Sequence, residues 1–214
     1  MVKFRGLAND AGEQVEVAEV EEGETLELQE ARVTASYQRG LRLLKERRLA
    51  DATQVWLETI NDQAFQRDVT GNPRFITLRN VQYLCVKNLA TVAEELDDKE
   101  AALEWLGQAV ALDDRDVVVW HKLGCIAQEL DRLNVARCSF ERGLCLRPQH
   151  QLCMERLCEV TYSIGDFEAC EAAADQLLKV MPSHPRAMLH KSLAMTSRGR
   201  SDMYCEDMLE DARE

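Results

Sequence analysis

The stretch "VVVWHKLGCIAQELDRLNVARCSFERGLCLRP", residues 117–148, decides the fold. Its first half places Trp120 and Gly124 on one apolar face at helical spacing, and its second half adds a small residue, Ala136, and an aromatic one, Phe140. A single amphipathic helix has no need of a glycine at this place. Because small residues let two helices approach closely, the stretch predicts two helices packed against each other.

The same pattern of large and small residues returns once before and once after this stretch, at a fixed period of about 34 residues. An earlier copy precedes these three, and a fifth half-copy follows them. The predicted copies are 33–66, 83–116, 117–150 and 151–184, with a partial copy at 185–200. A fixed period of this length is the signature of stacked helix pairs.

This spacing is that of the tetratricopeptide repeat, in which two antiparallel helices pack through small side chains. The expected fold class is all-α, a tetratricopeptide-repeat right-handed superhelix of about four and a half helix pairs. Because proline cannot continue a helix, a proline should follow the second helix of a pair. The expected structural core of the third copy is Trp120, Leu123, Gly124, Ala136, Phe140, Gly143 and Pro148.

An insertion of about residues 67–82 separates the first copy from the second. Gly71, Asn72 and Pro73 mark a turn there, and proline suits the first turn of a helix. We expect a short loop followed by an N-terminally extended helix that runs to about Leu96. A long loop inside an array is often a binding element, although it can equally be filler.

The two ends of the chain are acidic. Residues 1–30 hold nine acidic side chains against two basic ones, net −7, and residues 201–214 hold six against one, net −5. Because the chain carries −12 in all, residues 31–200 are neutral. We expect a partly disordered N-terminal segment at 1–30 and an acidic tail at 201–214, which serve solubility or meet basic partners. No direct nucleic-acid binding is expected, since no net positive field is present, and no apolar run is long enough for a membrane span.

The eight cysteines and four histidines do not predict a metal site or a catalytic centre. No Cys-x-x-Cys pair occurs, and His121 and Cys125, four residues apart, lack a third ligand. Nucleophile-elbow, phosphate-loop, dinucleotide and His-Glu-x-x-His motifs are missing. We therefore expect no enzyme activity, no catalytic residue, no cofactor and no metal. Without a secretion signal, the cysteines should be reduced thiols of an intracellular protein, with Cys158 and Cys170 buried at small-residue positions.

Tetratricopeptide arrays bind extended peptides or other proteins along the first helix of each pair. The lining expected here is mixed in charge, which favours a protein ligand. The possible partner-binding groove comprises Tyr37, Leu41, Lys87, Asn88, Thr91, His121, Lys122, Cys125, Glu155, Arg156 and Glu159.

Heat-shock co-chaperones are one subfamily with a known ligand, a C-terminal carboxylate held by a clamp of lysine, asparagine and arginine. In one register Asn88 matches that clamp, but Tyr37 and Leu41 replace a lysine and an asparagine. In the next register Lys87 and Arg156 match while other positions do not. A clamp without its cations loses its charge-assisted hydrogen bonds. A co-chaperone, or an unrelated cytosolic tetratricopeptide adaptor, is therefore the alternative hypothesis.

Longer stretches resemble one particular family. "VKNLATVAEELDDKEAALEWLGQAVALDDRDVVVWHKLGCIAQEL" and "VARCSFERGLCLRPQHQLCMERL" are similar to the N-terminal tetratricopeptide region of the calcineurin-binding protein Cabin family, the large scaffold subunit of the HIR histone chaperone complex. Features beyond the generic repeat are Lys-Asn-Leu-Ala at 87–90, Asp-Val-x-x-Trp at 116–120 and Leu-x-x-Ala-Arg-x-x-Phe-Glu-x-Gly-Leu at 133–144. The opening "MVKFRGLAND" is also similar, and the resemblance spans roughly residues 1–190.

The resemblance implies a nuclear scaffold and chromatin regulator that acts in replication-independent nucleosome assembly. The implied partners are a WD-repeat histone chaperone subunit, a second chaperone subunit and, indirectly, core histones. Family members are far longer, so we expect these 214 residues to be an N-terminal portion or a truncated gene model. The calcineurin-docking segment of animal members lies near their far end, so no calcineurin binding is expected. The family offers no short binding motif, and the sequence leaves the oligomeric state open.

Overall fold

The computed structural model describes residues 4–8, 14–18, 25–65 and 75–199. At the N-terminus, strands β1 (Phe4–Ala8) and β2 (Gln14–Ala18) form an antiparallel hairpin in which Phe4 lies opposite Ala18. This hairpin was not expected from the sequence. Its signal was the alternation of apolar and polar residues in "QVEVA", which is typical of a strand.

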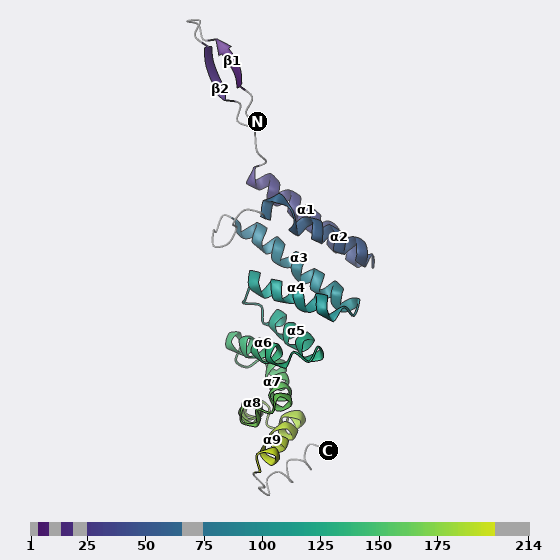
Figure 1. The fold of residues 1–214 in the computed structure, drawn as a ribbon, viewed down its shortest axis with the longest axis vertical. Coiled ribbons are helices and arrows are strands. Elements are labelled where there is room, and N and C mark those ends of the chain that lie inside the picture. The colour runs from purple at the N-terminus through teal and green to yellow at the C-terminus, as the bar shows by residue number, and fades with distance from the viewer. Residues whose placement is uncertain (1–3, 9–13, 19–24, 66–74, 200–214) are drawn as a thin grey trace.

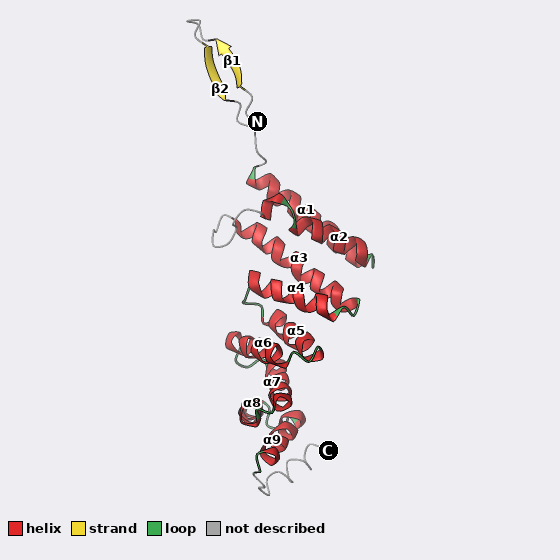
Figure 2. Ribbon diagram, in the orientation of Figure 1, coloured by secondary structure: helices red, strands yellow, loops and turns green. Residues whose placement is uncertain are grey.

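The described helices stack as successive antiparallel pairs along the long axis of the molecule (Figure 1), and helix dominates the described chain (Figure 2). Each helix packs on the next, and the odd-numbered helices also contact one another, as α1 does with α3 and α7 with α9. The helices, with the short 3-10 turn η1, are α1 (Leu26–Lys45), α2 (Leu49–Ile60), η1 (Gln63–Phe65), α3 (Ile76–Glu95), α4 (Lys99–Leu112), α5 (Val117–Glu129), α6 (Leu133–Leu146), α7 (Gln151–Ile164), α8 (Phe167–Val180) and α9 (Pro185–Ser197).

The backbone repeats with the period seen in the sequence. A residue with positive φ follows each odd-numbered helix: Arg47 (61°), Asp97 (56°), Asp131 (57°), Gly165 (86°) and Gly199 (71°). The last four occupy the same position in successive copies, and the first is displaced by the insertion. Glycine adopts this left-handed conformation freely and aspartate tolerates it better than most residues, which lets the chain reverse sharply between paired helices.

Where two paired helices approach most closely, a glycine on one helix faces an aromatic side chain on the other in two of the pairs. A Cβ on Gly124 would lie 2.5 Å from Cε1 of Phe140, and a Cβ on Gly40 would lie 2.5 Å from Cε2 of Trp56. Both aromatic rings are fully buried. The aromatic side chain therefore occupies the volume that the glycine leaves empty. The corresponding positions of the other two pairs hold Ala90 with Leu106 and Cys158 with Ala174, all of them buried.

Trp120 differs from its expected place in the core. Its neighbour Val119 is fully buried, whereas Trp120 packs against the core from the side and is only partly buried. The Trp120 indole Nε1 donates a hydrogen bond to the Asp114 carbonyl oxygen at 2.8 Å, and the Arg142 guanidinium lies 5.9 Å from the ring centre. An indole N–H requires an acceptor when it is buried, and the connection between α4 and α5 supplies one at the edge of the stack.

The remaining residues of the expected core fall into two groups. Leu123, Gly124, Ala136, Phe140 and Gly143 are buried between α5, α6 and their neighbours. Pro148 is exposed and lies just beyond the C-terminal end of α6, where it takes no part in the core.

Two boundaries differ from the expected copies. Helix α1 begins at Leu26, earlier than residue 33, because the Thr25 hydroxyl accepts a hydrogen bond from the Leu28 backbone N–H and caps the helix. Helix α3 begins at Ile76 and ends at Glu95, so the second part of the 67–82 insertion is helical, in agreement with the expected extended helix. Gly71, Asn72 and Pro73 lie outside the described residues, as does the tail at 201–214.

Candidate functional site

Helices α1, α3, α5 and α7 carry the residues of the expected groove, and we call the surface that they share with α9 the inner face. Polar contacts join successive helices across it. At its first step, the Asn88 side-chain amide on α3 donates to the Tyr37 hydroxyl on α1 at 3.2 Å. Leu41 is partly buried against the core, and the Thr91 hydroxyl bonds to the Lys87 carbonyl of its own helix. These two side chains therefore belong to the packing of the face more than to its open surface.

Asp116, at the start of α5, forms the polar contacts that join α3 to α5. Its Oδ2 accepts hydrogen bonds from Lys87 Nζ at 2.6 Å and from the Tyr83 hydroxyl at 2.7 Å, and its Oδ1 accepts from the Val118 backbone N–H at 2.8 Å. Burial opposes ionisation, but the Lys87 and Tyr83 hydrogen bonds lower the pKa of Asp116 to about 2. Burial and the neighbouring Asp116 carboxylate raise the pKa of Tyr83. One carboxylate thus ties α3 to α5 and caps α5.

Ion pairs continue along the face. Lys122 on α5 donates to both oxygens of Glu94 on α3, at 3.0 and 2.9 Å. On α7, the Glu159 carboxylate forms ion pairs with Arg156 of the same helix at 2.9 Å and with Arg186 of α9 at 3.2 Å. Each such contact joins two neighbouring helices or orders one of them.

Glu155 and Gln128 complete the same series. Arg186 Nη1 on α9 donates to Glu155 Oε1 on α7 at 2.7 Å. The Gln128 amide on α5 reaches Glu159 on α7 at 3.4 Å. The inner face is therefore continuous from α3 to α9 through charged and amide side chains.

The consequence is a charge-balanced surface. The expected cations Lys87, Lys122 and Arg156 are each paired with a carboxylate already within the described chain. Exposed pairs of this kind contribute only about 0–1 kcal/mol each, so their main effect is to place the helices relative to one another. Because these cations are neutralised, the face does not offer the cluster of free positive charge that a phosphate backbone or a carboxylate clamp requires.

His121 lies at the centre of the face without forming a reactive site. Its ring lies 5.8 Å from that of His150, and Cys125 Sγ lies 3.6 Å from its Nε2. Burial, with His150 and Arg156 nearby, lowers the pKa of His121, and burial raises the pKa of the Cys125 thiol. At neutral pH the pair is therefore an uncharged imidazole beside a protonated thiol, which is a poor nucleophile.

Metal clusters and membrane spans are both missing from the part of the chain that the structure describes. There, no three side chains of the metal-binding types come together into a cluster. No helix in residues 25–65 or 75–199 combines the length and apolar character needed to cross a membrane.

Sequence reasoning missed several residues that build the inner face. Glu94 and Gln128 occupy equivalent positions in successive copies, one helical turn beyond the positions expected to line the groove. Extending the expected register by that turn would have found both. Asp116 and Arg186 were missed because they precede or begin a helix, where only the tertiary structure shows which side chains they meet.

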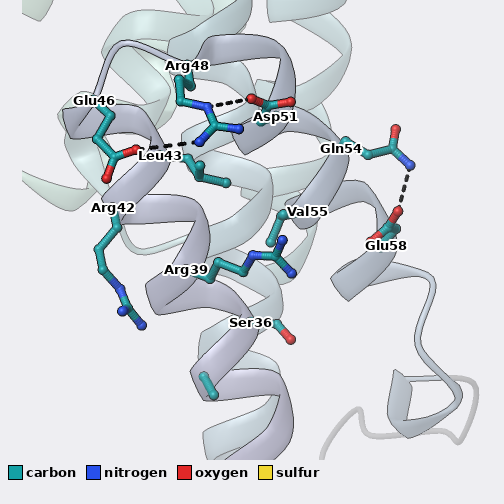
Figure 3. Close-up of a pocket in the computed structure, with 11 residues that line it drawn as sticks. Ser36, Arg39, Arg42, Leu43, Glu46, Arg48, Asp51, Gln54, Val55 and Glu58 are labelled. Atoms are coloured by element: carbon teal, nitrogen blue, oxygen red, sulfur yellow. Dashed lines mark hydrogen bonds and ion pairs between the residues drawn. The ribbon is translucent and has the colours of Figure 1, made fainter.

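A hollow of about 700 Å³ lies elsewhere, on the open side of α1 and α2. Figure 3 shows Arg39 and Arg42 on the α1 side, with Arg48 joined to Asp51 and Gln54 joined to Glu58. This end groove is wide and open, and its position explains its polarity.

Interior repeats use the same positions for packing. Where α1 has Arg39, the next two copies have the buried Leu89 and Leu123, and where α1 has Ser36, the next copy has the buried Val86. A terminal repeat requires a polar outer face because no helix covers it. Among the described residues no helix precedes α1, so the end groove is the solvated end of the described stack, and its size alone does not make it a binding site.

Comparison with solved structures shows the fold. A crystal structure of MamA protein has a TM-score of 0.66 at 17% identity, covering 84% of this chain and 89% of that one. A crystal structure described as YrrB, a TPR protein with an unusual peptide-binding site, has a TM-score of 0.65 at 11% identity, covering 83% of this chain and 82% of that one. The stack of helix pairs is thus a tetratricopeptide-repeat superhelix.

Comparison with known sequences shows the family. Calcineurin-binding protein 1 of Arabidopsis thaliana is 33% identical over 170 residues, which cover 76% of this chain but only 9% of that protein. The chain therefore spans less than a tenth of the length of this relative. The family model of the CABIN1 N-terminal domain matches residues 30–198, from α1 to the end of α9. Together with the repeat array and its extended α3, this match shows that the chain belongs to the calcineurin-binding Cabin family through its N-terminal domain.

Proposed function

We propose that this domain is a non-catalytic scaffold of the HIR histone chaperone complex and acts in the nucleus in replication-independent nucleosome assembly. Its direct partners are other protein subunits, among them the WD-repeat histone chaperone subunit, and it meets core histones indirectly through them. The observation that carries the proposal is membership of the Cabin family over residues 30–198. Protein interaction is also the role typical of the repeat fold.

The charge pattern of the inner face favours a protein partner and disfavours a nucleic acid. Its cations are paired with carboxylates, as in Lys122 with Glu94, while the Asn88 and Gln128 amides join neighbouring helices through uncharged hydrogen-bond donors. A ligand of mixed polarity fits such a surface better than a polyanion does. The YrrB protein, which shares the fold, is described as having a peptide-binding site, which agrees with this use of the architecture.

Affinity purification from nuclear extract tests the proposal. The tagged protein should recover HIR-complex subunits, and moderate salt should weaken their association only modestly, because a charge-balanced face depends little on long-range attraction. Recovery of heat-shock chaperones or cytosolic proteins without any histone-chaperone subunit would instead support the adaptor hypothesis and exclude the chromatin role.

Two lysines provide a matched comparison of faces. Lys122→Glu reverses a charge on the inner face, and Lys179→Glu makes the same charge change at an exposed position of α8. Loss of subunits with the first variant alone locates the partner on the inner face. The double variant Lys122→Glu/Glu94→Lys restores the ion pair. Comparing the stability of the single and double variants therefore shows whether the loss of subunits in Lys122→Glu results from a loss of folding.

A further inference from the structure

A small hollow of about 240 Å³ lies between the first two turns of α3 and the end of α4. These two helix ends lie at the same edge of the stack (Figure 1). We call it the α3–α4 pocket. The extension of α3 builds one side of it, and the connection from α4 to α5 builds the other. Its lining consists of Ile76, Arg79, Asn80, Tyr83, Leu112, Asp113 and Arg115. It adjoins the contacts of Tyr83 and Lys87 with Asp116 on the inner face, and it is distinct from the end groove.

Arg79 is the unusual member of this lining. Its Nε atom is buried and has no hydrogen-bond partner among the described residues, so a ligand oxygen reaches it only when the Arg79 side chain shifts toward the hollow. A buried N–H without an acceptor costs about 1–3 kcal/mol in general, so the site favours any ligand that brings an acceptor to it. A carboxylate is the natural match, because its two oxygens can accept from Nε and from a terminal nitrogen of the guanidinium together.

The local charge agrees with an anionic ligand. Arg115 pairs with Asp113 at 3.2 Å, which leaves the charge of Arg79 uncompensated among the residues that line the pocket. This single positive charge stands within a chain whose net charge is −12. The pocket therefore suits one carboxylate.

Besides the polar Asn80, three apolar side chains line the hollow: Ile76, Tyr83 and Leu112. Ile76 is 58% exposed, a large exposure for an isoleucine, and Leu112 faces the same hollow. The Tyr83 ring forms a rigid wall because its hydroxyl is held by Asp116, which Lys87 also holds. An aliphatic side chain placed between Ile76, Leu112 and the Tyr83 ring would cover apolar surface that now faces water.

We propose that the α3–α4 pocket binds a protein segment that presents a carboxylate beside an aliphatic side chain. Sites for whole small molecules measure about 300–1,000 Å³ in general, so a hollow of this smaller size suits one or two side chains. A polyanion is disfavoured, since Asp113 lines the hollow and Asp116 lies next to it. This inference adds an anchor to the protein-binding role and does not depend on which complex the partner belongs to.

N-acetyl-leucine is the minimal probe, because it joins a carboxylate to a leucine side chain. It should shift the Nε–Hε resonance of Arg79 and the methyl resonances of Ile76 in the full chain, saturating with a dissociation constant on the order of millimolar, as expected for so small a ligand. N-acetyl-leucinamide lacks the carboxylate, and acetate and inorganic phosphate lack the side chain, so each should bind about tenfold more weakly or not at all.

Matched variants locate the effect. Arg79→Gln should abolish the response of Ile76 to N-acetyl-leucine, while Arg42→Gln, an arginine of the end groove, should leave it unchanged. Ile76→Ser should weaken binding, while Leu152→Ser, which removes a similarly exposed aliphatic side chain from α7, should not. Far-ultraviolet circular dichroism checks that each variant keeps its helices.

Three outcomes would overturn the proposal: no saturable shift at Arg79 and Ile76, an equal response to acetate or phosphate, which would make the pocket a simple anion site, or an equal response in the Arg79→Gln variant. The titration uses defined probes, so its result is the same whether or not HIR-complex subunits are recovered in the purification described above.

Discussion

Gly124→Ala and Gly107→Ala form a pair of identical substitutions that should change stability in opposite directions. A Cβ on Gly124 would lie 2.5, 2.7 and 2.8 Å from three ring carbons of Phe140, which is far inside contact distance. A Cβ on Gly107, in the interior of α4, would meet no heavy atom within 4 Å. Both positions are helical, so both variants gain the same helix propensity.

The magnitudes follow from these two terms. Replacing glycine by alanine in a helix interior gains roughly 1 kcal/mol, and forcing an extra carbon into a packed core costs about 1–3 kcal/mol. Gly107→Ala should therefore stabilise the protein by about 0.5–1 kcal/mol, and Gly124→Ala should destabilise it by about 1 kcal/mol. In a chain of this size the two variants should melt on the order of 5 °C apart.

Thermal and urea unfolding followed by circular dichroism measures both variants. A double variant, Gly124→Ala/Phe140→Leu, provides the internal control, because the equivalent positions of the second repeat naturally hold Ala90 and Leu106. The coupling between the two changes should be favourable, since the smaller side chain at position 140 leaves room for the new methyl group. Gly124→Ala with wild-type or higher stability would refute the argument that close approach at Gly124 limits this fold.

Three further predictions concern titration and reactivity. Asp116→Asn keeps the helix cap but removes the charge. Because the pKa of Asp116 in the folded protein is lowered to about 2, its carboxylate stabilises the folded state by about 1–2 kcal/mol above about pH 4, and this stabilisation is lost as the pH falls towards 2. The free energies of unfolding of the two proteins in urea should therefore converge near pH 2, and a difference that does not change with pH would contradict this. His150 Nδ1 accepts a hydrogen bond from the Cys153 backbone N–H at 3.2 Å and so caps α7. Burial, together with Arg147, lowers the pKa of His150, so the cap is complete above pH 6.5 and is lost as the pH falls below this value and the ring becomes protonated. His150→Asn should remove about 1 kcal/mol of the resulting loss of stability in acid, and an unchanged profile of stability against pH would rule out the cap as its source. Iodoacetamide should modify the exposed Cys138 and Cys145 of the native protein well before Cys85, Cys153 and Cys158, whose pKa values burial raises to about 12; mass spectrometry showing equal rates would contradict this.

The sequence by itself determined the repeat and therefore the fold. The fixed period, with a small residue such as Gly124 on one helix and a large one such as Phe140 on the next, depends on contacts between helices that follow each other directly in the chain. Such contacts are local, so the residue types on the two helices are enough to predict them. Family membership was likewise evident from motifs in the sequence. The partial burial of Trp120 was not, because an indole at a repeat position can lie in the core or at its edge.

Only the tertiary structure decided which polar residues meet. Lys122 and Glu94 are 28 residues apart and belong to different helix pairs, so their contact depends on the angle and offset at which one repeat stacks on the next. Within one pair, the packing of the extended α3 on α4 brings Arg79 to the hollow that Leu112 and Arg115 also line, with its Nε left without an acceptor among the described residues. Residue types and spacing do not specify that offset, because it results from the packing of many side chains at once. For this reason the fold could be predicted from the sequence, while the pairing of charges on the inner face and the α3–α4 pocket could not.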